Sequence, residues 1–153
     1  MNKYTKLALW IGIYLAVAFG IGQITQGSID SWYIDLEKSS LTPPNYVFPI
    51  MWTILYIMIA TAGWKLWTTE CDHYLKILYI RYTVLNLAWT PVFFGFHWIF
   101  AALGVIILLN IAAALIIKKA WKQVRLVSYL MIPPTLWTLF AAYLNLMIFS
   151  LNT

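Results

Sequence analysis

Long runs of apolar residues, separated by few charged positions, are the main pattern along this chain. Four stretches contain no Lys, Arg, Asp or Glu, and they cover residues 7–29, 39–64, 82–117 and 126–153. A helix needs about 20 apolar residues to cross a bilayer. The third stretch is too long for one helix and contains Gly95-Phe96-His97, where we divide it into two spans.

The pattern therefore predicts an all-α membrane protein with five transmembrane helices, at residues 7–24, 46–67, 75–94, 98–117 and 124–151. The first span is near full spanning length, so we interpret it as a retained helix and not as a signal peptide. Pro133-Pro134 lie inside the fifth span, where their missing N–H groups predict a kink. Since no repeat or long linker divides the chain, we expect one transmembrane domain over residues 1–153.

The first connection, residues 25–44, is much longer than the others and carries three of the five acidic residues, Asp30, Asp35 and Glu37. Loops of this length usually have a function. Residues 32–36 are amphipathic enough to form a short interfacial helix or a lid over the bundle. The alternative is a solvated loop whose Trp is anchored among the lipid headgroups.

Composition supports the membrane assignment: 63% of the residues are hydrophobic and 10% are charged, against roughly 45–50% and about 25% in globular domains. The net charge of +5 follows the predicted topology, with Lys38 on one face and nine basic residues on the other: Lys3, Lys6, Lys65, Lys76, Arg81, Lys118, Lys119, Lys122 and Arg125. This distribution predicts a cytoplasmic N-terminus in a bacterial inner membrane. Attraction to anionic lipid headgroups accounts for the remaining basic surplus, so we expect no nucleic-acid partner.

Three of the predicted helices carry aromatic residues at helical spacing, so that each presents one aromatic face. These faces comprise Phe48, Trp52 and Tyr56, then Asn86, Trp89 and Phe93, then Trp137, Phe140, Ala141, Leu144 and Asn145. These aromatic faces either line a ligand site, or they only pack the bundle or face lipid. Three of the Trp residues lie deep inside their spans, away from the interfacial belt that membrane Trp prefers. A buried indole N–H needs an acceptor. Asn86 and Asn145 are the polar residues nearby, and they either belong to the ligand site or only join helices.

Few residues offer catalytic or metal-binding chemistry. No acidic residue lies in any predicted span, which argues against an ion-driven pump and against metal binding at depth. His73 and His97 fall at opposite membrane faces, and Cys71 is the single cysteine. We therefore expect a binding protein with no metal and no permanent cofactor, built around an aromatic-lined cavity for a large flat hydrophobic ligand.

A ridge of small residues, Gly12, Ala16 and Gly20, lies at four-residue spacing in the first span. Such ridges allow close approach between helices in a membrane. The ridge serves either packing within the monomer or a homodimer interface.

Four segments of the chain resemble the TspO/translocator proteins, also called tryptophan-rich sensory proteins or peripheral-type benzodiazepine receptors. The matching residues are Trp32-Tyr33 with Leu36 and Lys38; Pro43-Pro44 with Val47-Phe48, Trp52-Thr53 and Leu55-Tyr56; Asn86 with Trp89 and Phe93-Phe94; and Pro133 with Trp137, Phe140-Ala141 and Leu144-Asn145. They occur in matching order, and the number of helices agrees.

The resemblance implies a five-helix bundle, often a homodimer, that binds porphyrins such as protoporphyrin IX, sterols, and isoquinoline or benzodiazepine ligands under the first loop. The porphyrin would be a ligand and not a resident cofactor. Carried over by position, the pocket residues are Trp32, Phe48, Trp52, Asn86, Trp89, Phe93, Trp137, Phe140, Ala141 and Leu144, and the faces described above add Tyr56 and Asn145. The alternatives implied are a transporter, or light- and oxygen-dependent porphyrin breakdown through Trp52 and Trp137.

The chain departs from the family pattern at three places. Pro134 stands where the family usually has Tyr before the helix-five Trp, so a ligand bond from that Tyr is absent. Ser39 replaces a common Pro. Leu146 and Ser150 occupy the Tyr and basic positions of the animal cholesterol-recognition stretch, so we expect no high-affinity cholesterol recognition.

Overall fold

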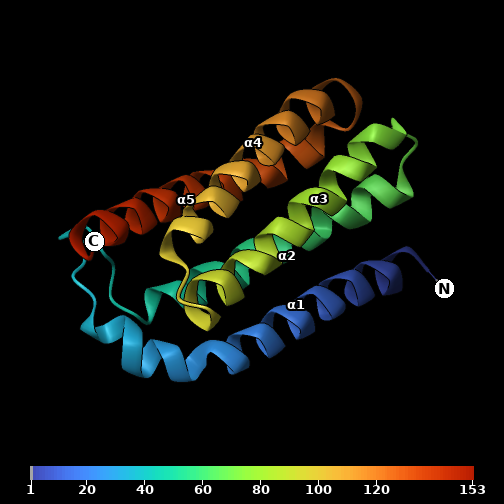
Figure 1. The fold of residues 1–153 in the computed structure, drawn as a ribbon. Coiled ribbons are helices and arrows are strands. Elements are labelled where there is room, and N and C mark those ends of the chain that lie inside the picture. The colour runs from blue at the N-terminus through green and yellow to red at the C-terminus, as the bar shows by residue number, and fades with distance from the viewer. Residues whose placement is uncertain (1) are drawn as a thin grey trace.

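The computed structural model describes residues 2–153, and five long helices make up most of it (Figure 1). Two short π-helices, η1 and η2, follow α1 and α3. The bounds are α1 Lys3–Ser28, η1 Ile29–Tyr33, α2 Val47–Thr68, α3 His73–Thr90, η2 Pro91–Gly95, α4 Ile99–Gln123 and α5 Arg125–Leu151. All five long helices have the length and apolar composition needed to cross a membrane, which confirms the predicted five-span all-α fold.

The helices form a ring in which α1 contacts α2, α2 contacts α5, α5 contacts α4, and α4 contacts α3. Contacts from α1 to α3 and η2 complete the ring. The N-terminus and the α2–α3 and α4–α5 connections lie at one end of the bundle, and the C-terminus lies at the opposite end (Figure 1). Neighbours in space are therefore not always neighbours in sequence.

The predicted end of the first helix, residue 24, is wrong. The helix continues through Ser28 and directly into η1, so residues 25–31 of the predicted connection, including Asp30, are helical, and Trp32 and Tyr33 continue that helix instead of starting a separate one. Loss of hydrophobicity marks where a span leaves the apolar layer, not where its backbone hydrogen bonds stop. Polar side chains here bond the preceding turn: the Ser31 hydroxyl donates to the carbonyl of Gly27 at 2.7 Å.

The break between the third and fourth helices is confirmed, and Pro91 accounts for its form. Proline lacks an N–H and displaces the carbonyl of the preceding turn. The helix responds by widening into η2, in which the Phe96 N–H donates to the Pro91 carbonyl at 2.9 Å. His97 then takes a positive φ of 58° and reverses the chain into α4. In α5, by contrast, the helix runs on through Pro133 and Pro134.

The α2–α3 connection is fixed to the end of α4. Asp72 caps α3 by accepting from the Tyr74 N–H at 3.0 Å, and its backbone N–H donates to the Gln123 side chain at 2.8 Å. The hydrogen bond from the Lys119 ammonium, also 3.0 Å, lowers the pKa of the Asp72 carboxyl. These contacts join the start of α3 to the end of α4 at one end of the bundle.

The α1–α2 connection is held against the end of α5 by one amide side chain. The Asn152 side chain accepts from the backbone N–H of Glu37 at 3.0 Å and donates to the Glu37 carbonyl at 2.9 Å. Ser39 and Tyr143 hydroxyls make a further bond of 3.1 Å. The first connection is thus bonded to α5 at two points, Glu37 and Ser39, which directly follow the segment 32–36 for which a lid was one alternative.

Gly63 marks the closest approach between α2 and its neighbours. A Cβ atom at this position would overlap the Tyr79 phenol ring and lie 2.8 Å from the Trp10 indole. The Tyr79 hydroxyl is itself held by a 2.8 Å bond to the Ile59 carbonyl, so the ring has no freedom to move away.

Gly63→Ala should therefore destabilise the protein by about 1–3 kcal/mol, the usual cost of overpacking a well-packed core. The measurement is thermal unfolding in detergent. Gly104→Ala in α4 is the matched control, because nothing lies within 4 Å of its added Cβ. Equal melting temperatures for the two variants would contradict the proposed close packing.

Asn152→Ala should release the α1–α2 connection, because both bonds to the Glu37 backbone are lost. We expect faster amide hydrogen exchange and faster proteolysis in residues 36–46, with the helices unchanged. Ser150→Ala is the control, since the Ser150 hydroxyl bonds only within its own helix, to the Leu146 carbonyl. Unchanged exchange at the Glu37 amide in Asn152→Ala would show that the clamp has no role.

Candidate ligand-binding site

A cavity of about 750 Å³ opens between α1, α2 and α5 and reaches the ends of α3 and η2. Its size falls within the roughly 300–1,000 Å³ typical of small-molecule sites. Aromatic and aliphatic side chains make up most of its wall, with amides, hydroxyls and one carboxylate among them. The lining includes Phe19, Gln23, Gln26, Asp30, Tyr33, Phe48, Trp52, Tyr56, Trp89, Phe93, Phe94, Ala141, Leu144 and Asn145.

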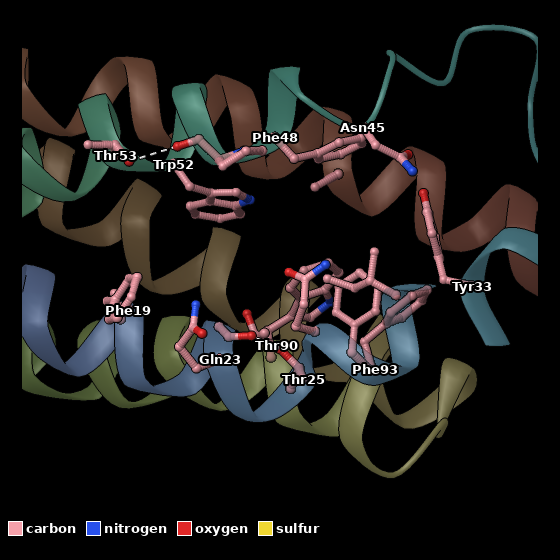
Figure 2. A pocket seen from close by; sticks show the side chains of 18 of the residues that line it. Phe19, Gln23, Thr25, Tyr33, Asn45, Phe48, Trp52, Thr53, Thr90 and Phe93 are labelled. Atoms are coloured by element: carbon pink, nitrogen blue, oxygen red, sulfur yellow. Dashed lines mark hydrogen bonds between the residues drawn. The ribbon is translucent and has the colours of Figure 1, made fainter. Parts of the chain in front are cut away.

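One wall consists of the aromatic face predicted on the second helix. Phe48, Trp52 and Tyr56 all line the cavity, and the Trp52 and Tyr56 rings stack with centroids 5.2 Å apart. Figure 2 shows Trp52 and Phe48 on this wall, across the cavity from Phe19 and Gln23 of α1. Helical spacing places the three rings on one side of α2, so they present one aromatic face to the cavity.

The opposite wall comes from the third helix and the two π-helices. Trp89 and Phe93 stack with centroids 5.3 Å apart, and Phe94 packs edge-on against Phe93 at 4.8 Å. Tyr33 of η1 meets the Phe94 ring edge-on at 5.3 Å. Both π-helices therefore contribute to the cavity, in agreement with the frequent occurrence of π-turns at functional sites.

Asn145 fixes the orientation of Trp89. Its side-chain carbonyl accepts from the Trp89 indole N–H at 3.2 Å, while its amide donates to the Ile99 carbonyl at 3.0 Å. The residue is 1% exposed and lines the cavity. It thus joins helices, one of the two alternatives from the sequence, and positions a cavity side chain; its contact with a ligand stays a prediction.

Of the twelve residues predicted for the ligand site, eight line the cavity: Phe48, Tyr56, Trp52, Trp89, Phe93, Ala141, Leu144 and Asn145. The other four lie outside the lining. Trp137 packs behind the cavity wall, edge-on against Phe48 at 6.0 Å, and Phe140 lies beside Trp137 at 5.8 Å. These two residues support the wall.

Asn86 is buried away from the cavity, where its side-chain oxygen accepts from the Tyr14 hydroxyl at 3.3 Å. Its amide nitrogen is buried without a hydrogen-bond partner in the structure. The bond joins α3 to α1, which agrees with the helix-joining alternative for this residue.

Trp32 also lies outside the lining, at the junction of η1 with the α3–α4 turn. Its indole stacks on the His97 ring, with centroids 4.1 Å apart and planes 16° apart, and it meets Phe93 edge-on at 5.6 Å. His97 Nε2 lies 3.3 Å from the Ser28 hydroxyl. Trp32 therefore packs against Phe93 and links η1, which continues α1, to η2.

Sequence reasoning missed the contribution of α1. Residues at intervals of three or four from Leu15 to Tyr33 line the cavity, including Gln23, Gln26 and Asp30. The available signal was this helical spacing, which continues past residue 24 across the segment that we assigned to a loop. Asp30 thus lies on a helix that crosses the membrane, although we expected no acid in a span.

The cavity wall offers mainly apolar side chains, with amides, hydroxyls and the Asp30 carboxylate. Among residues 2–153, no group of three or more His, Cys, Asp or Glu residues could hold a metal ion.

Lys38, near the cavity's η1 end, donates to the carbonyls of Ile34 at 3.2 Å and Leu36 at 2.7 Å and lies 4.8 Å from the Tyr33 ring centroid. Desolvation lowers the pKa of the Lys38 ammonium, and Asp35 opposes this shift.

Comparison with known proteins agrees with this architecture. The TspO/MBR family model matches residues 10–151. The chain is 37% identical to the tryptophan-rich protein TspO of Chlorobaculum tepidum, over 99% of both chains. It is 35% identical to that of Archaeoglobus fulgidus, over 96% of this chain and 97% of the relative. The human translocator protein shares 32% identity over 88% of this chain and 85% of its own. The protein is thus an integral membrane protein that belongs to the TspO/MBR family.

Proposed function

We propose that this protein is a membrane receptor or regulator that binds porphyrins and other flat hydrophobic molecules in its aromatic cavity. The observation that supports this proposal most directly is the pair of facing aromatic walls, Trp52 with Tyr56 on one side and Trp89 with Phe93 on the other. A flat ligand between them would contact ring faces on both sides.

The polar groups of the cavity are better suited to orienting a ligand than to catalysing a reaction. Asn145 is committed to Trp89 and Ile99, and Gln23 and Asn45 place amides at the wall (Figure 2). A few polar groups in an apolar cavity are the usual means of fixing how a ligand lies. Isoquinoline- and benzodiazepine-type ligands and sterols share the required apolar bulk.

We further propose that the N-terminus faces the cytoplasm, in a bacterial inner membrane. The N-terminus and the α2–α3 and α4–α5 connections lie at one end of the bundle (Figure 1). Eight of the ten Lys and Arg residues lie at this end, Arg81 lies nine residues into α3, and Lys38 lies in the α1–α2 connection. Cytoplasmic loops carry such an excess of basic residues.

Light- and oxygen-dependent porphyrin breakdown is the second candidate, and the position of the Trp52 indole on the cavity wall favours it. Trp137, the other residue implied in this reaction, lies outside the cavity lining and meets Phe48 edge-on. A catalyst would degrade many porphyrin molecules per protein under light. Loss of one porphyrin per protein, with an oxidised Trp52, would instead indicate photodamage of a bound complex.

Trp52→Leu should weaken protoporphyrin IX binding by about tenfold or more, since stacking on one indole is worth roughly 1–3 kcal/mol in base-binding proteins. Trp137→Leu should weaken it less than threefold, because this residue contacts the ligand only through Phe48. An absorbance titration in detergent measures both constants.

Melting temperatures of the two variants provide the control for folding. Equal losses of affinity at equal stability would contradict the assignment of Trp52 to the wall and Trp137 to its support. Affinity unchanged in both variants would place the porphyrin elsewhere in the protein.

A further inference from the structure

One outward face of α4 changes from apolar to basic toward the end of the helix. Six exposed residues recur along it at intervals of three and four: Gly104, Leu108, Ile111, Leu115, Lys118 and Lys122. Residues at this spacing share one side of a helix. Because all six are exposed, the rest of the described chain leaves this side, the α4 outer face, open to its surroundings.

The apolar part of the α4 outer face has the length of one lipid leaflet. From Gly104 to Leu115 the helix rises about 16 Å, at about 1.5 Å per residue, and half of the hydrocarbon core of a bilayer is about 15 Å thick. The exposed Trp121 follows Lys118 within one turn, and membrane proteins place Trp at the level of the headgroups. The change from apolar to basic therefore falls where the acyl chains of a leaflet end and its phosphates begin.

Three lysines surround a hollow at the basic end of this face. The hollow has a volume of about 350 Å³ and is lined by Leu115, Lys118, Lys119, Lys122 and Gln123. Since Leu115 also belongs to the apolar part of the α4 outer face, the hollow is continuous with that part. An ammonium group binds phosphate as a compact point charge with three donors.

The α2–α3 connection holds two of the lining residues in place. Lys119 donates to the Asp72 carboxylate at 3.0 Å and lies 4.5 Å from the centroid of the Tyr74 ring. The Gln123 side chain accepts from the backbone N–H of Asp72 at 2.8 Å. This side of the hollow is thus ordered before any ligand arrives, which lowers the entropy cost of binding.

Lys118 and Lys122 carry the positive charge that no acidic side chain neutralises. Across the described residues, 2–153, the one salt bridge is that between Lys119 and Asp72. Lys118 and Lys122 lie four residues apart on α4, and like charges at this spacing repel one another. An anion between them replaces this repulsion with attraction, so the hollow favours a ligand that is negatively charged at this level.

We propose that the α4 outer face binds one anionic phospholipid, taken from the leaflet on the side of the N-terminus. The acyl chains lie along the apolar part of the face, and the phosphate and headgroup occupy the hollow between Lys118 and Lys122. This end of the bundle carries the N-terminus and the α2–α3 and α4–α5 connections (Figure 1). Within the described chain no residue of α4 lines the aromatic cavity, so the lipid site is separate from the cavity.

The test counts lipids bound to the full chain by native mass spectrometry in a non-ionic detergent. Dioleoylphosphatidylglycerol is the anionic probe, and dioleoylphosphatidylcholine is the zwitterionic one with the same acyl chains. The wild-type protein should bind one phosphatidylglycerol about tenfold more tightly than phosphatidylcholine, because each Lys near an anionic headgroup strengthens binding several-fold. In the double variant Lys118→Gln with Lys122→Gln this preference should fall below about threefold.

Lys3→Gln with Lys6→Gln is the matched control, because it removes two exposed positive charges from the same end of the bundle, on α1 and outside the hollow. Its preference should equal that of the wild type. The single variant Lys122→Gln should lower the preference to about threefold, and it keeps the test decisive if the double variant does not fold. Melting temperatures check the folding of each variant.

Equal losses of preference in the two double variants would overturn the inference, because they would show attraction to the whole basic end of the bundle and not to one site. A wild-type protein that binds both lipids equally would overturn it as well. Glycerol 1-phosphate, which has the phosphate without acyl chains, should not displace the lipid at equal concentration. Displacement would show a site for free phosphate groups and would also overturn the assignment to a lipid.

Discussion

The hydrocarbon interior of a bilayer offers the backbone no hydrogen-bond partners, and the structure depends on this constraint. Each spanning segment must satisfy its own N–H and C=O groups, so the chain forms five long helices. Irregular backbone is tolerated at depth only beside protein or a cavity. The π-helix Pro91–Gly95 obeys this rule, since it packs against Tyr33 of η1 and contributes side chains to the cavity wall.

The same constraint governs the polar side chains inside the bundle. Asn145, Tyr79 and Tyr14 each bond a group on another element or a distant turn, and these bonds fix how the helices meet. Asn145 shows how packing and the candidate site depend on one another, because the amide that joins α5 to α3 and α4 also holds the Trp89 ring against the cavity. A membrane bundle with little water inside gains its specificity from such bonds.

The aromatic walls and the polar part of the cavity lining have different physical characters. The walls are stacked aromatic pairs, whose contribution to binding would depend on the flatness and apolar area of a ligand. The polar part of the lining carries the Gln23 and Gln26 amides and the Asp30 carboxylate. Residues behind the walls, such as Trp137 and Trp32, keep the lining rings in place without facing the cavity.

The sequence by itself determined the five spans, the break at Gly95-Phe96-His97 and the aromatic faces of the second and third helices, because apolar run length and helical spacing are local properties. Only the tertiary structure decided which residues of the aromatic faces line the cavity. Trp52 lines the cavity, whereas Trp137 lies outside the lining and meets the lining residue Phe48 edge-on. The course of α1 through Tyr33 also required the structure, since falling hydrophobicity marks the edge of the apolar layer and not the end of a helix. That continuation brings Asp30 to the cavity, where the local pattern placed a loop.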